Sequence, residues 1–146
     1  MGTFISTKGR YAIRVLIDLA EHSSDGKVPL KEIAERQQIS QKYMESIMSL
    51  LVRAGIVSGS HGKGGGYELL VPPSECSVGS ILRATEGNLC MVSCLGGDVV
   101  CERAPGCRTL PMWKHLDDMI WNYLDTVSVQ DLMYGREDRP IPILPE

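Results

Sequence analysis

Residues 28–55 read VPLKEIAERQQISQKYMESIMSLLVRAG, and the spacing of the apolar residues in this stretch decides the fold. Pro29 suits the start of a helix, where its missing amide hydrogen costs nothing, and the helix is short, ending near Gln37. Ser40 is placed to cap a second helix over 41–54 by accepting from the free amides of its first turn. Two short helices joined by a tight turn pack at a steep angle, so the stretch predicts a helix-turn-helix.

The apolar residues of this stretch are spaced to form a core shared by the two helices. Ala34 lies where the helices approach each other closely, so a small side chain is needed there, and Ile39 fills the turn. Gln38 departs from the common pattern, because such turns often have glycine at that position. The predicted core residues are Leu30, Ile33, Ala34, Ile39, Met44 and Ile47.

The segments on either side of this motif extend it to a winged helix. A first helix is predicted from Ser6 or Thr7, either of which can cap it, to the turn sequence at 23–26. After the third helix the pattern changes to two short strands, 56–59 and 67–71. The connection between them is rich in glycine, which allows the backbone torsions of a tight β connection.

The second half of the chain is again mostly helical. A helix is expected over 77–85, a loop rich in glycine and cysteine over 87–108, and a long helix with an apolar stripe over 110–125. Ser128 should cap a last short helix, with Asp131 as its reciprocal partner. The fold class is therefore mainly α with a small β-wing. Four segments are expected: a winged helix-turn-helix over 1–73, a linking helix and cysteine loop over 74–108, the long and final helices over 109–135, and an irregular tail over 136–146.

Positive charge gathers in the first half of the chain, although the whole chain has a formal charge of −3. Residues 1–70 carry +2 and residues 71–146 carry −5, so the first half can face phosphates. In a helix-turn-helix the second helix enters the major groove of DNA, where Gln, Ser and Glu can bond base edges while Lys and Arg find phosphates. The predicted DNA contacts are Lys8, Arg10, Gln41, Lys42, Tyr43, Glu45, Ser46, Ser49, Arg53, His61 and Lys63.

Other classes of protein fit these features less well. A helical domain with a solvated or protein-binding polar face has the same helix spacing but does not explain the glycine-rich wing. The segment 62–66 lacks the terminal Lys-Ser/Thr of a nucleotide-binding loop. The histidines are scattered and no nucleophile–base pair is suggested, so we expect no enzyme. The sequence has no export signal and no apolar run that spans a bilayer, so we expect a cytoplasmic protein with no membrane partner.

Four of the five cysteines crowd into residues 90–107. In a reducing compartment such a cluster is more often a metal or redox site than a set of structural disulfides. Cys94, Cys101 and Cys107 are separated by six and five residues, which is wider than the CxxC pairs of zinc ribbons and suits a larger iron–sulfur cluster. Cys90 adds a candidate fourth thiolate, whereas Cys76 lies apart. Ordinary reduced cysteines and a disulfide switch remain open alternatives.

The sequence resembles the IscR-like family of bacterial iron–sulfur and redox-responsive regulators over about residues 5–135. Each motif is weak alone, but the combination is specific. The residues that carry the resemblance are Ser6–Ala12, Val28–Leu30, Ile33–Glu35, Ile39–Glu45, Gly55–Val57, Gly62–Tyr67, Gly79–Leu82, Cys94, Cys101, Cys107 and Trp113.

The resemblance implies a homodimer held by the long helix 110–125, which binds a palindromic operator on double-stranded DNA as a repressor or activator. It implies that Cys94, Cys101 and Cys107 hold an iron–sulfur cluster, with 2Fe–2S favoured over 4Fe–4S. Glu45 matches a recognition-helix glutamate that in some members tunes operator choice. A thiol or disulfide switch, a zinc site, or action through a partner enzyme are the alternative forms of control.

Two residues depart from the family pattern. Leu110 occupies the position of a histidine ligand in some members, which leaves the fourth ligand open. His61 occupies a wing position where relatives often have arginine, and imidazole as a chemical group, unlike guanidinium, changes its charge near neutrality. The candidate fourth ligands are Cys90, Glu102, His115, a residue of the partner chain, or a small exogenous ligand.

Overall fold

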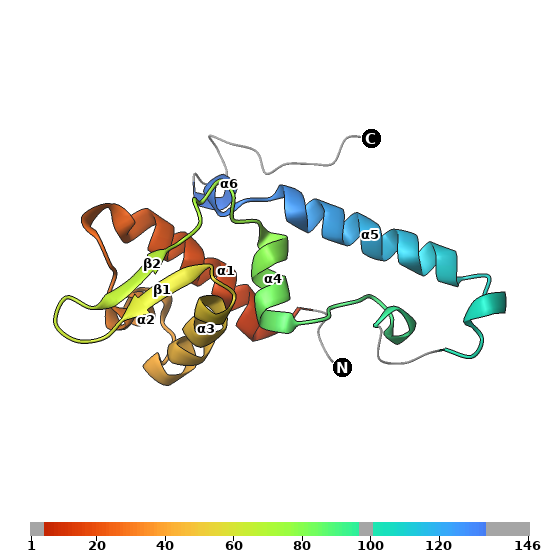
Figure 1. Ribbon diagram of the computed structural model, residues 1–146, viewed down its shortest axis with the longest axis horizontal. Coiled ribbons are helices and arrows are strands. Elements are labelled where there is room, and N and C mark those ends of the chain that lie inside the picture. Colours follow the sequence, from red (N-terminus) through yellow and green to blue (C-terminus); the bar gives the residue numbers. More distant parts are fainter. Residues whose placement is uncertain (1–4, 97–100, 134–146) are drawn as a thin grey trace.

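The computed structural model describes residues 5–96 and 101–133. The chain begins with α1 (Thr7–His22), followed by a short 3₁₀ turn (Ser23–Asp25). Next come the two helices of the predicted motif, α2 (Leu30–Gln37) and α3 (Gln41–Arg53). Figure 1 shows these helices, a two-stranded hairpin, α4 and α6 gathered into one body, from which α5 projects.

The helix-turn-helix forms as the sequence predicts. Ser40 Oγ accepts from the Tyr43 amide at 3.2 Å and caps α3, as expected. Gln38 adopts a left-handed conformation with φ of 56°, which is the conformation that explains why this position often has glycine. The turn then brings the Ile39 amide to 3.0 Å from the carbonyl oxygen of Ala34. Ile39, Ala34 and their predicted core partners on α3 are buried.

The body has one main core. α1 contributes its inner face, capped by Ser6, whose hydroxyl accepts from the Gly9 amide at 3.3 Å. The core is completed by the inner faces of α2 and α3 and by residues of β1, α4 and α6. Its largest fully buried side chains are Leu16, Leu19, Ile33, Met44, Ile47, Met48, Leu51 and Ile81.

The wing is a two-stranded antiparallel hairpin of β1 (Val57–Ser60) and β2 (Gly66–Leu69). These strands lie within about one residue of the predicted segments, and the Leu70 amide still donates to the Ile56 carbonyl at 2.9 Å. The hairpin is held to the start of α2 by a short bridge between Val28 and Tyr67. A Cβ at Gly66 would lie 2.5 Å from the Val28 carbonyl oxygen, so only glycine allows this approach.

After the wing the chain leaves the body and returns to it. α4 (Val78–Glu86), capped by Ser77, leads into a loop with two 3₁₀ turns (Ser93–Leu95 and Ala104–Gly106). α5 (Leu110–Thr126) and α6 (Val129–Met133) follow. The return point is fixed by backbone hydrogen bonds of 2.8 Å from Val78 N to Val127 O and from Val129 N to Cys76 O.

Ser128 and Asp131 cap α6 reciprocally, as expected, through hydrogen bonds between 2.9 and 3.1 Å. The predicted tail 136–146 lies outside the described residues. Within the described parts of the chain, none of the helices combines the length and the apolar character that crossing a membrane requires.

α5 differs from the other long helices because none of its side chains is fully buried in the described chain. Its last turns pack on a small second cluster around Val78, Leu82 and Val127. Toward its start it leaves apolar side chains in solvent, with Met112 53% and Met119 47% exposed. The predicted apolar stripe is half-buried at Trp113, Leu116 and Ile120, and the two methionines lie exposed on another side of the helix, so the described residues cover this part of α5 only partly.

Candidate nucleic-acid interface and cysteine loop

α3 has one buried face and one polar face. Met44, Ile47, Met48 and Leu51 are fully buried, which fixes the rotation of the helix on the body. The opposite face is exposed, apart from the half-buried Tyr43 near its start. The structure thus brings together on this face the predicted contacts Gln41, Lys42, Tyr43, Glu45, Ser46, Ser49 and Arg53.

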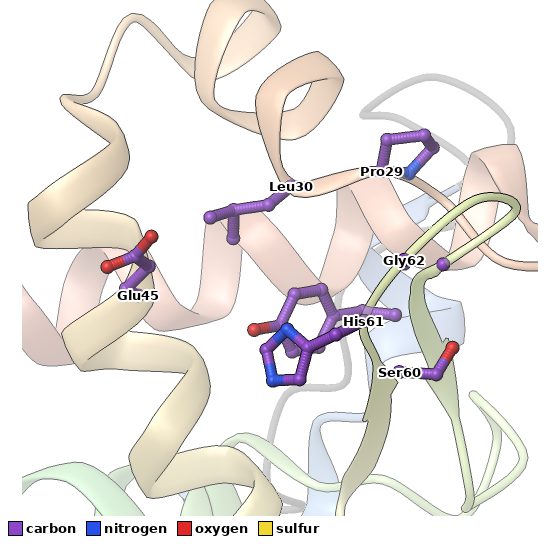
Figure 2. A pocket seen from close by; sticks show the side chains of 9 residues that line it. Pro29, Leu30, Glu45, Ser60, His61 and Gly62 are labelled. Carbon is purple, nitrogen blue, oxygen red and sulfur yellow. The ribbon is translucent and has the colours of Figure 1, made fainter.

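The wing lies beside this polar face and leaves a hollow of about 240 Å³ between them. Figure 2 shows Glu45 on α3 at one side of the hollow and His61 on the wing at the other. Burial, and then the nearby charge of Glu45, raise the pKa of the Tyr67 hydroxyl, which also lines the hollow. Lys63 is exposed in the turn of the wing, as expected for a side chain that reaches a phosphate.

The two predicted contacts on α1 lie elsewhere. Arg10 is exposed and Lys8 is half-buried, both in the first turns of the helix. This end of α1 is held against the end of α4, where the Ser6 amide donates to Glu86 Oε1 at 3.0 Å. Lys8 and Arg10 therefore lie on α1 and are not part of the polar face of α3.

Asp18 of α1 anchors the helix-turn-helix from beneath. Its carboxylate is 3% exposed and accepts from Arg36 at 2.7 Å and from Gln37 at 2.8 Å. Burial alone would raise the pKa of Asp18, but these hydrogen bonds and the Arg36 charge hold it below its ordinary value. Asp18 was not among the predicted residues, because an aspartate at an inward position of an apolar helix can only be interpreted once its partner is known.

Arg14 is a second residue that the sequence did not single out as a contact. It lies on the exposed side of α1 and donates through Nε to Gln37 Oε1 at 3.2 Å and through Nη2 to the Gln37 carbonyl at 3.3 Å. Its guanidinium also lies 5.2 Å from the centre of the Tyr11 ring. The sequence signal for Arg14 is its spacing of four residues from Arg10, because residues four apart lie on the same side of a helix.

The cysteine loop joins α4 to α5. All five cysteines are free; Cys76 is buried, and the other four are partly exposed. Cys94 lies in the first 3₁₀ turn and Cys107 directly after the second. Within residues 5–96 and 101–133, no three His, Cys, Asp or Glu side chains lie close enough together to hold a metal ion. The loop therefore does not gather the three predicted ligands as it stands.

The environments of the loop cysteines differ. The Thr109 hydroxyl, and then the backbone at Thr109 and Leu110, lower the pKa of the Cys107 thiol, while burial raises that of Cys76. The Cys90 sulfur lies near Gly96, where a Cβ would be 3.3 Å away. The loop is tied to α5 by the Met91 amide, which donates to Asp117 Oδ1 at 2.9 Å. Partly exposed, unpaired thiols fit the donor chemistry of an iron–sulfur cluster, whereas the buried Cys76 does not.

Residues 5–135 match the family described as "Rrf2: Iron-dependent Transcriptional regulator". The chain belongs to the Rrf2 family. It is 38% identical over 133 residues to the HTH-type transcriptional regulator IscR of Aliivibrio salmonicida, an alignment that covers 91% of this chain and 79% of that protein. It is 36% identical over 134 residues to IscR of Vibrio cholerae, with 91% and 76% covered.

Solved structures of Rrf2-type regulators share the fold. The T. potens IscR structure has a TM-score of 0.72 at 34% identity, covering 94% of this chain and 91% of that one. CymR, the global cysteine regulator of B. subtilis, has a TM-score of 0.74 at 33% identity, with 92% and 98% covered. The oxidized form of Staphylococcus aureus CymR has a TM-score of 0.71 at 31% identity, with 91% and 98% covered.

These comparisons confirm four predictions. The resemblance to IscR-like regulators is correct, and the fold is the expected winged helix with a long additional helix. The chain is a DNA-binding transcription regulator of the IscR and Rrf2 type, and it is not an enzyme.

Proposed function

We propose that this regulator binds a palindromic site on double-stranded DNA as a homodimer, with α3 in the major groove and the wing on the adjacent backbone. The observation that carries the proposal is the polar face of α3, which is exposed beside the wing while the opposite face is locked in the core. Gln41, Glu45, Ser46 and Ser49 would then meet base edges, and Lys42, Arg53 and Lys63 would meet phosphates.

The test separates base contacts from phosphate contacts. A duplex selected from a random-sequence pool and a shuffled duplex of the same composition are titrated at several salt concentrations. We expect Ser46→Ala and Glu45→Gln to change the ratio between the two affinities. Lys63→Ala and Arg53→Ala should weaken both affinities alike and lower the salt slope by about 0.9 per lost phosphate contact. Equal behaviour of the two pairs of variants would contradict the assignment.

The proposed dimer is supported by α5. A stable helix without a buried face needs a partner, because apolar side chains in water forfeit the free energy of burial. A second copy of α5 would cover Met112 and Met119 and would set the spacing of two reading heads on a palindrome.

For control of DNA binding we propose an iron–sulfur cluster held by Cys94, Cys101 and Cys107. When bound, such a cluster supplies a group whose state depends on iron supply and oxidants. The three thiolates would have to be drawn together by closing of the loop between α4 and α5, since the described loop does not gather them. Closing of the loop would act on α5 at two places, at Asp117 through its hydrogen bond from Met91 and at the start of the helix through the contact between Cys107 and Thr109. The distances between the three cysteines would then be coupled to the orientation of α5.

The cluster proposal is tested by purification without oxygen, with iron and sulfide counted and the visible spectrum recorded. Each of Cys94→Ala, Cys101→Ala and Cys107→Ala should abolish the visible absorption, whereas Cys76→Ala should retain it. Cys90→Ala, Glu102→Gln and His115→Ala then show which side chain, if any of the three, supplies the fourth ligand. Substoichiometric iron and a colourless protein would contradict the proposal, and bound zinc would favour a structural metal site.

A thiol switch is the second candidate for control. The partly exposed Cys90, Cys94, Cys101 and Cys107 support it, and one structural neighbour is titled as an oxidized form. Two thiols of the loop would then lose two protons and two electrons to a peroxide, giving a disulfide and water. Peroxide-dependent disulfides in mass spectra of iron-free protein, with a matching change in DNA affinity, would establish this mechanism over the cluster.

A further inference from the structure

A chain of contacts runs from α1 to the first turn of the recognition helix α3. The Arg14 guanidinium donates to two atoms of Gln37, the side-chain Oε1 at 3.2 Å and the backbone carbonyl oxygen at 3.3 Å. The same guanidinium lies over the Tyr11 ring at 5.2 Å. Tyr11 in turn meets the Tyr43 ring edge to face, with centroids 6.0 Å apart and planes at 79°.

This series of contacts constrains one side chain on the polar face of α3, that of Tyr43. It lies one turn into α3, it is half-buried, and its neighbours Lys42, Glu45 and Ser46 are all exposed. The exposed neighbours have no comparable support from α1. An aromatic side chain has only two rotatable bonds, so one packed ring against it can fix its direction.

Gln37, at which this series of contacts ends, is itself held in place. Gln37 Nε2 donates to the buried Asp18 carboxylate at 2.8 Å, and Arg36 holds the same carboxylate at 2.7 Å. The Gln37 side chain therefore presents its Oε1 to Arg14 in one direction. Because Gln37 has this second anchor, Arg14 contacts a rigid surface and not a mobile side chain at the end of α2.

We infer that Arg14 and Tyr11 are positioning residues for sequence recognition, which orient Tyr43 so that it reads DNA in one direction. The inference rests on the proposed function, because it needs α3 to enter the major groove. Arg14 directs its Nε donor and one Nη2 donor to Gln37, and this internal anchoring distinguishes the role we infer for it from that of the phosphate contacts Lys63 and Arg53. The structure in this way makes α1 part of the reading head.

The experiment uses the full chain and two probes, a duplex that the unaltered chain selects from a random pool and a shuffled duplex of equal length and composition. Arg14→Lys keeps the charge but loses the planar stack and the forked donors. Tyr11→Leu removes the ring that meets Tyr43, and Tyr11→Phe is the matched control that keeps it. Thermal unfolding of each variant shows that the body still folds, and Arg14→Lys changes only an exposed side chain.

We expect Arg14→Lys and Tyr11→Leu to lower affinity for the selected duplex roughly three- to tenfold, the range of one aromatic or stacked contact. Affinity for the shuffled duplex and the salt slope should stay the same, and Tyr11→Phe should behave as the unaltered chain. Selection repeated with Tyr11→Leu should relax the same base positions as selection with Tyr43→Leu.

Three results would overturn the inference. Unchanged discrimination in Arg14→Lys and Tyr11→Leu would show that Tyr43 needs no support. Equal weakening on both duplexes in Arg14→Gln, with the salt slope lower by about 0.9, would make Arg14 a phosphate contact instead. Relaxation of base positions that Tyr43→Leu leaves intact would separate Tyr11 from Tyr43. Failure of the unaltered chain to select any sequence would instead count against the proposed function itself.

Discussion

The reading body, which we define as α1 to α3, the wing, α4 and α6, differs from α5 and its loop in how each is stabilised. The body buries a continuous core that includes Leu16, Ile33, Met44 and Leu51 at full burial. α5 has no fully buried side chain in the described chain, yet it carries a regular apolar stripe. The body thus forms its core within one chain, whereas α5 leaves apolar side chains partly exposed among the described residues.

The two regions meet at a small joint. Arg83 of α4 binds Asp125 of α5 through two hydrogen bonds of 2.7 and 2.8 Å and covers the Trp121 ring at 4.4 Å. The Trp121 indole donates to the Leu89 carbonyl at 3.2 Å, which adds the start of the cysteine loop to the joint. The joint adds this partly exposed ion pair to the small apolar cluster around Val78, Leu82 and Val127.

The largest expected effect comes from the exposed methionines of α5. Met119→Glu should leave the body folded but place a charge in the proposed dimer surface, because Met119 is 47% exposed in the single chain. Loss of the dimer removes the second half-site, so affinity for the palindrome should fall by about a hundredfold or more. Sedimentation velocity and DNA titration measure both effects.

Lys114→Glu is the control on another side of α5, where Lys114 pairs with Asp118 at 3.0 Å. It should keep both the dimer and the affinity. A Met119→Glu variant that still sediments as a dimer would place the dimer surface elsewhere.

The next largest effect is on the stability of the body. Asp18→Asn removes the buried carboxylate that holds Arg36 and Gln37, and we expect it to lower the free energy of unfolding by about 2 kcal/mol at neutral pH. The folded-state pKa of Asp18 is lowered, so its contribution is full above the unfolded value near 3.9 and is lost as the pH falls through the folded value.

Urea unfolding from pH 7 downward measures this contribution. The gap between the unaltered chain and Asp18→Asn should narrow in acid below about pH 4. The exposed Asp25 provides the control, since Asp25→Asn removes a carboxylate at the surface and should change the free energy of unfolding little at neutral pH. A gap that stays constant into strong acid would mean that the loss arises from packing and not from the charge.

A smaller effect concerns the joint. Arg83 and Asp125 are 49% and 41% exposed, so solvent screens the pair, and a double-mutant cycle with Arg83→Gln and Asp125→Asn should give about 0.5–1 kcal/mol. The body should lose little stability in either variant, while DNA binding should become less sensitive to the state of the cysteines. If DNA binding in both variants depends on the state of the cysteines as it does in the unaltered chain, the joint does not couple the cysteine loop to the body.

The smallest effect sharpens the account of the turn and has the opposite sign. Gln38 has a φ of 56°, which is strained for a residue with a Cβ, so Gln38→Gly should raise the free energy of unfolding by about 0.5 kcal/mol after the entropy of glycine is subtracted. Gln38→Val should instead be destabilising, since β-branched residues tolerate this region least. Urea midpoints of the two variants, measured against the unaltered chain, give the sign directly.

Much of the body could be predicted from the sequence because its signals are local. The caps Ser6, Ser40 and Ser77 and the return cap Ser128 act within three residues of their partners, so spacing alone identifies them. The polar face of α3 follows from helical periodicity in the same way.

The remaining features depend on contacts far apart in the chain. Asp18 with Arg36, and Arg83 with Asp125, join residues that no local pattern relates. The arrangement of Cys94, Cys101 and Cys107 could not be predicted either, because six and five intervening residues fix only an upper limit on their separation. The second copy of α5 that we propose as its cover would come from another chain, so no local pattern in one chain could show it.

Backbone hydrogen bonds link Val78 to Val127 and Val129 to Cys76. The chain segment that starts with α4 and ends with α5 therefore begins and ends at the same place on the body. α4 lies within this closed segment and packs in the body, so the cysteine loop and α5 are attached to the body at α4 and at the return near Val127. Lengthening the loop adds little to the cost of folding, since each doubling of a flexible loop costs only about 0.6 kcal/mol. A loop of different length could therefore join α4 to α5 at little cost to the stability of the body.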